Sequence, residues 1–184
     1  MSCAHLALRA SKTVLLLLIG IYFLLAAIDN IADPSANWIY LVHVLSMDTV
    51  PGDSHLGWRS LRSAAVNRLL FGGLVTWELV TALLCFVGTG KLLQARSGSR
   101  QEFACAKSWG VAGLTCSLVE WLFFFLILAG EWFQLWRGAL SAALEVAARM
   151  FTVTALCLIY LTQEEGGPDS DPPAKHAPLQ KNAD

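Results

Sequence analysis

Long runs of apolar residues alternate with short polar stretches along this chain. Four of the runs are long enough to cross a bilayer, at residues 13–31, 64–95, 105–130 and 139–162. A hydrocarbon core of about 30 Å needs about 20 residues of α-helix, and backbone amides in lipid must bond within their own segment. The pattern therefore predicts an all-α fold, a four-helix transmembrane bundle in one domain of residues 1–162.

The first apolar segment also fits a second interpretation. Arg9 and Lys12 precede it, as basic residues precede the apolar region of a secretory signal peptide. The run is longer than the usual apolar region, and no A-x-A cleavage site follows it. We therefore expect the segment to be retained as the first membrane helix.

Basic residues predict the orientation, because Lys and Arg are enriched in short cytoplasmic connections. They are concentrated before the first segment and where the second segment passes into the third: Arg9, Lys12, Lys91, Arg96, Arg100 and Lys107. The other two connections mix their Arg residues with more acidic ones. Both termini are therefore expected in the cytoplasm, and the first and third connections outside.

The first outer connection is expected to contain a short amphipathic helix at residues 36–47. Apolar side chains recur there at helical spacing: Trp38, Leu41, Val42 and Leu45. Tyr40 and Ser46 are expected on the opposite face. Such a helix lies at the membrane interface or docks on the bundle. The tail, residues 163–184, is rich in Pro and polar residues, which predicts a disordered cytoplasmic segment.

The composition is that of a membrane protein. Of the 184 residues, 55% are hydrophobic and 15% charged, whereas soluble domains average about 45–50% apolar and about 25% charged residues. The formal net charge of −1 argues against nucleic acid as a partner. The five cysteines form no C-x-x-C pair, so neither a disulfide framework nor a zinc site is expected.

Catalytic and cofactor motifs are absent from the sequence. It contains no G-x-S-x-G, no H-E-x-x-H and no pair of Asp within the apolar segments. No His lies inside those segments to hold a haem. We therefore expect no enzymatic activity and no cofactor.

Charged residues nevertheless interrupt three of the apolar segments. Glu78, Glu120 and Arg149 lie near the middle of the second, third and fourth segments, where a charge costs about 2.5–3.5 kcal/mol. We expect them to converge inside the bundle, with Glu145 one turn from Arg149 and Arg68 reaching in from the outer edge. Arg149 can bridge two carboxylates. The network is either a structural ion-pair cluster or a site for protons, an ion or a polar substrate.

Further polar and aromatic residues lie in the outer connections. His43, Asp48 and Glu131 are metal-ligating residue types, but their spacing matches no ligand motif, and no metal site is expected. Trp132 is placed where an outer aromatic belt belongs.

Four short stretches together are similar to one bacterial family. They are HVLSMDT at residues 43–49, WE at 77–78 followed by TALL at 81–84, GEWF at 130–133 and AARMF at 147–151. In this order they resemble the predicted small integral membrane proteins, a family of unknown function. The resemblance covers nearly the whole chain apart from the tail.

The resemblance implies four membrane helices, a location in the bacterial inner membrane and no assigned activity. The positions that match the family's polar signatures are Asp48, Glu78, Glu131, Trp132 and Arg149. One stretch departs from the family pattern, in which the fourth helix opens with a Trp and a polar run of Asn, Gly and Gln. This chain has SAAL at residues 141–144, so a role that needs those amides is not implied here.

Three classes of function remain open on the sequence. The first is a non-enzymatic accessory or assembly subunit of a larger membrane complex, with membrane lipids and other membrane subunits or further copies as partners. The second is a small proton- or ion-responsive transporter or channel component. That class requires an oligomer, because four helices rarely enclose a translocation path. The third is a membrane enzyme acting on a lipid or a quinone.

Overall fold

The computed structural model describes residues 3–52 and 54–164. Within these residues all regular elements are helical. Four helices are long and apolar enough to cross a membrane: Ala4–Ala32, Ala64–Gln94, Arg100–Trp132 and Ala142–Thr162. The predicted all-α four-helix architecture is therefore confirmed. Residues 165–184, which hold most of the tail predicted to be disordered, lie outside the described residues.

Nine helical elements follow one another in the described part of the chain. They are α1 (Cys3–Ala32), α2 (Ser35–Ser46), η1 (Gly57–Arg59), α3 (Ala64–Gln94), α4 (Arg100–Ala106), α5 (Ser108–Val119), η2 (Glu120–Trp132), η3 (Leu135–Arg137) and α6 (Ala142–Thr162). The third membrane-length helix thus consists of α4, α5 and η2 in succession. η2 is π-helical, with wider turns than an α-helix.

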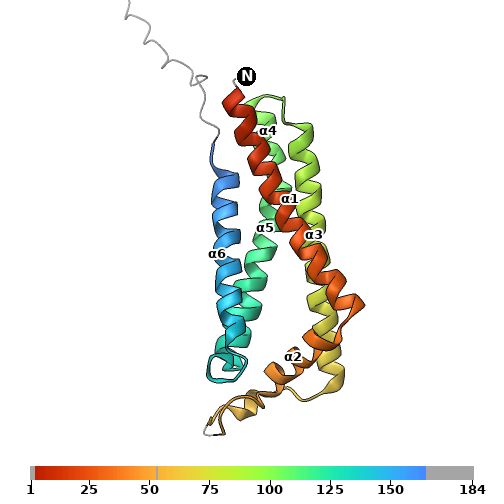
Figure 1. Ribbon diagram of the computed structural model, residues 1–184, viewed down its shortest axis with the longest axis vertical. Coiled ribbons are helices and arrows are strands. Elements are labelled where there is room, and N and C mark those ends of the chain that lie inside the picture. The colour runs from red at the N-terminus through yellow and green to blue at the C-terminus, as the bar shows by residue number, and fades with distance from the viewer. Residues whose placement is uncertain (1–2, 53, 165–184) are drawn as a thin grey trace, which may run out of the picture.

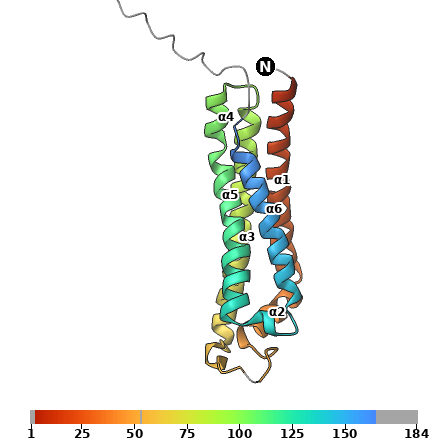
Figure 2. The same cartoon turned by 90° about the vertical axis from the view of Figure 1, so that its left-hand side faces the viewer.

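The four long helical segments run side by side (Figures 1 and 2). α3 packs against α1 and α5, and α6 packs against α5, η2 and α1. The start of α1 and the end of α6 lie at one end of the bundle, here called the terminal end. α2 lies across the opposite end, here called the α2 end (Figure 1).

Glycines allow α3 and α5 to approach closely. A Cβ atom on Gly88 would lie 2.6 Å from the backbone nitrogen of Gly110, and a Cβ on Gly113 would lie 2.9 Å from the nitrogen of Cys85. Real side chains do not tolerate such contacts with backbone. Small residues at these positions therefore set the distance between the two helices, as is common in membrane proteins.

α1 begins at Cys3 rather than at residue 13 as predicted. Arg9 lies within the additional turns, and its side chain is buried rather than exposed to water. Its guanidinium Nη1 donates to the carbonyl oxygens of Arg96 (3.0 Å) and Gly98 (2.8 Å), and it lies 4.6 Å from the ring centroid of Phe103. These carbonyls lie in the connection between α3 and α4, so Arg9 joins α1 to that connection.

At the terminal end of the bundle, two lysines join α1 and α5 to the end of α6. The Nζ atoms of Lys12 on α1 and Lys107 at the start of α5 both donate to the carbonyl oxygen of Gln163. That oxygen is at the C-terminal end of α6, where cations are favoured because carbonyl groups there lack helical partners.

The predicted short helix is present as α2. An apolar cluster holds it against the loop that follows η2: Val44, Leu45, Met47, Phe133 and Leu135. The expected orientation of Tyr40 is wrong, because its hydroxyl donates to the carbonyl oxygen of Leu140 (3.0 Å) and its ring faces the bundle. Burial raises the pKa of Tyr40. α2 therefore closes one end of the bundle.

Candidate functional site

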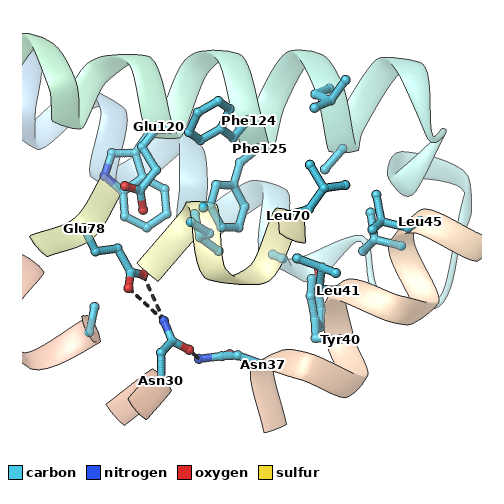
Figure 3. A pocket seen from close by; sticks show the side chains of 18 of the residues that line it. Asn30, Asn37, Tyr40, Leu41, Leu45, Leu70, Glu78, Glu120, Phe124 and Phe125 are labelled. Atoms are coloured by element: carbon cyan, nitrogen blue, oxygen red, sulfur yellow. Dashed lines mark hydrogen bonds between the residues drawn. The ribbon is translucent and has the colours of Figure 1, made fainter. Parts of the chain in front are cut away.

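A cavity of about 590 Å³ lies in the half of the bundle nearer α2. α1, α2, α3, η2 and the start of α6 contribute its walls (Figure 3). Most of the lining is aliphatic or aromatic, including Leu41, Leu45, Leu70, Phe124, Phe125 and Leu128. Other lining residues, such as Leu69 and Val146, are exposed at the surface, so an apolar chain can reach the cavity from the lipid side.

Two carboxyl groups face this cavity at the end farther from α2. Glu78 on α3 and Glu120 at the first position of η2 are 5% and 2% exposed, and both line the cavity. Figure 3 shows the two side chains at the same end of it. Sequence reasoning expected these two residues to lie inside the bundle, and the structure brings them to one site.

Two amide side chains form a hydrogen-bonded chain that ends on Glu78. The Nδ2 atom of Asn30 on α1 donates to both carboxylate oxygens of Glu78, at 3.0 and 2.9 Å. The Nδ2 atom of Asn37 on α2 donates in turn to Oδ1 of Asn30, at 2.7 Å. This chain of hydrogen bonds links α2, α1 and α3, and Asn30 supplies the donor that both oxygens of Glu78 accept from.

Other polar atoms at the site have no partner among the described residues. Oε2 of Glu120 and Nε1 of Trp121 are both buried without a hydrogen bond, and both side chains line the cavity. A buried polar atom without a partner costs about 1–3 kcal/mol. Such atoms on a cavity wall mark positions where a bound molecule can supply the missing contact.

The π-helical turns of η2 place several large side chains on the cavity. Residues 120, 121, 124, 125, 128 and 129 all line it, and the wide turn is visible where Phe133 N donates to Leu128 O, five residues back, at 3.0 Å. π-helical turns are frequent at functional sites. The sequence gives no signal for this widening, because an apolar run looks the same in either type of helix.

Three members of the predicted charge network do not lie in the interior, and this part of the prediction is wrong. Arg149 and Glu145 on α6 and Arg68 on α3 are exposed and do not line the cavity. The buried face of α6 includes Ala147. Residues two positions away on either side are turned by about 200°, so Arg149 and Glu145 lie on the opposite face. Arg68 lines a shallow groove on α3 instead.

The polar and aromatic candidate residues of the first and third connections lie at the α2 end and do not line the cavity: His43, Asp48, Glu131 and Trp132. Nδ1 of His43 is 2.8 Å from Oδ2 of Asp48. Trp132 packs edge-to-face against Trp58 with ring centroids 6.0 Å apart, and Glu131 beside it is exposed. No group of three or more His, Cys, Asp or Glu in the described part of the chain could hold a metal ion.

Sequence reasoning missed Asn30, Asn37 and Trp121. A signal for Asn30 is present in the sequence: Tyr22, Ala26 and Asn30 recur every four residues on α1, and all three line the cavity. A polar side chain that continues such a face at the end of an apolar segment is a candidate for a buried partner.

The fold and the site together define a polytopic membrane protein with an acidic cavity between its helices. Residues 8–164 match the family described as "Predicted small integral membrane protein (DUF2165)", and the chain belongs to this family. No curated protein and no solved structure matches the chain.

Proposed function

We propose that this protein is a non-enzymatic subunit of a larger membrane assembly, which docks on its partner through the exposed face of α6. One observation carries the proposal: Glu145 and Arg149 are exposed on a helix that is otherwise apolar enough to cross a membrane. In the described residues neither side chain forms an ion pair.

Contact with lipid makes exposed charges on a membrane helix costly. An Arg or an acidic side chain inside the hydrocarbon region costs about 2.5–3.5 kcal/mol when lipid surrounds it. A partner helix that offers a carboxylate to Arg149 and a donor to Glu145 removes most of that cost. Ala148 and Thr152 lie on the same exposed face, and small side chains let a second helix approach.

Photo-cross-linking in native membranes tests the docking face. A photoreactive amino acid at Thr152 should give one or a few discrete protein adducts, because this position lies under the proposed partner. The matched control is Leu83 on α3, which is 61% exposed and should give none. Mass spectrometry then identifies the partner as another protein or a second copy. Equal adducts at both positions, or none at Thr152, would contradict the proposal.

We further propose that the protein lies in the bacterial inner membrane with both termini in the cytoplasm. The basic residues at the terminal end support this orientation, since Lys and Arg are enriched on the cytoplasmic side. Reporter fusions after Ser97 and Gln163 should behave as cytoplasmic, and fusions at Gly52 and Gly138 as external. A cytoplasmic signal at Gly52 would reverse the orientation.

The second candidate function is a proton- or ion-responsive component that works as an oligomer. The observation that favours it is the pair of buried carboxyl groups, Glu78 and Glu120, on one cavity. Ionisable residues inside a membrane commonly belong to proton and ion pathways.

A further inference from the structure

The charges around the cavity are all of one sign. Its titratable lining residues in the described part of the chain are two acids and two phenols: Glu78 from α3, Glu120 from η2, Tyr22 from α1 and Tyr40 from α2. α6 contributes only Ala143 and Val146. No Lys, Arg or His is among the described lining residues. An anionic head group is therefore repelled from this cavity.

The hydrogen bonds assign different states to the two acids. Glu78 accepts at both oxygens from Asn30, which requires acceptors and suits a carboxylate. Glu120 has a buried oxygen without a partner, and a second anion beside Glu78 would have no cation to balance it. A single proton, held by Glu120, and one net negative charge on the pair fit both observations.

Aromatic rings line the same cavity as the acid pair. The rings of Trp121 and Phe125 are 5.0 Å apart, and those of Tyr22 and Trp121 are 6.2 Å apart. All three residues line the cavity. The faces of aromatic rings attract cations, most strongly where water is excluded.

We propose that the cavity binds a lipophilic cation. Its positive group lies between Glu78 and Glu120 against the aromatic rings, and its apolar part lies along the wall that Leu41, Leu45 and Leu70 form toward α2 (Figure 3). The inference goes beyond the docking role and does not depend on it, because none of these residues belongs to the exposed face of α6.

Proton release accompanies this binding. When the cation enters, the carboxyl group of Glu120 gives its proton to water and becomes the second carboxylate around the positive charge. One cation is bound and up to one proton is released, so binding strengthens as pH rises through the range in which Glu120 titrates. Among the described residues, the titratable groups that line the cavity are the two acids and the two phenols named above.

Two probes test the site on the full-length purified protein in a neutral detergent. Tetraphenylphosphonium and dodecyltrimethylammonium should quench tryptophan fluorescence saturably, and a pH indicator in weak buffer should record proton release. A neutral quinone with an isoprenoid tail and dodecyl sulfate are the matched neutral and anionic probes. Equal or tighter binding of either would overturn the assignment to cations.

Two variants assign the response to the acid pair. Glu78→Gln should weaken binding of tetraphenylphosphonium by about tenfold or more, the effect of losing one charged contact. Glu120→Gln should weaken it as well and abolish proton release. Glu131→Gln, the same change at an exposed position of η2, should alter neither. If a variant fails to fold, the wild-type protein still tests the proposal. Saturable binding of the cation without proton release would contradict it. Unchanged binding in folded Glu78→Gln contradicts it too.

Discussion

Asn30→Leu should lower the free energy of unfolding by about 2–3 kcal/mol, the range for a hydrogen bond to a charged group whose partner stays buried. Asn30 is the described donor to Glu78, at 3.0 and 2.9 Å to its two oxygens. Its loss leaves a carboxylate that is 5% exposed without a donor. Reversible unfolding in mixed micelles, followed by tryptophan fluorescence, measures the change.

The double variant Asn30→Leu with Glu78→Leu is the control for this explanation. It removes the donor and the charge together, and replacing a complete buried polar group by apolar residues is often neutral. It should therefore be more stable than Asn30→Leu alone. If the loss of unfolding free energy in the double variant equals the sum of the losses in Asn30→Leu and Glu78→Leu, the two side chains do not interact.

Gly88→Ala should destabilise the bundle by about 1–3 kcal/mol, the usual cost of an overpacked contact. The new Cβ would lie 2.6 Å from the nitrogen and 2.8 Å from the Cα of Gly110. These are backbone atoms, so α3 and α5 must move apart as rigid elements. Thermal denaturation of the detergent-solubilised protein measures the effect.

The matched control is Gly90→Ala, two residues further along the same helix. A Cβ at Gly90 meets nothing within 4 Å. This substitution should be neutral or slightly stabilising, because alanine favours the helix more than glycine does. Equal destabilisation by both substitutions would show that glycine acts through flexibility of α3 and not through contact with α5.

The number of membrane-length helices could be predicted from the sequence, but the direction of each side chain could not. Apolar length predicts four crossings, and helical spacing predicts α2. The same reasoning placed Glu78, Glu120 and Arg149 at a similar depth. The direction of each side chain depends on which face of its helix packs against the bundle. On α6 the buried face contains Ala147, so Arg149 is exposed.

The partners of charged residues near helix ends could not be predicted from the sequence either. Arg9 and Lys12 serve in the sequence as signals of orientation, and they predict a helix that begins after them. In the structure both are buried, at 4% and 3% exposure, and bind carbonyl oxygens at the ends of other helices. These partners are distant in sequence, so no local pattern could have revealed them.

The central claim is that Glu120 holds a proton beside the carboxylate of Glu78 in a membrane cavity, without help from Arg149. Infrared spectroscopy of the purified protein at neutral pH tests it through the carbonyl band of a protonated carboxylic acid. The band should be present in the wild type, lost in Glu120→Gln, and retained in Glu78→Gln and Arg149→Leu. The control is a double variant that lacks both acids. The account is contradicted if the wild type shows no more of this band than the control, or if Arg149→Leu changes the band.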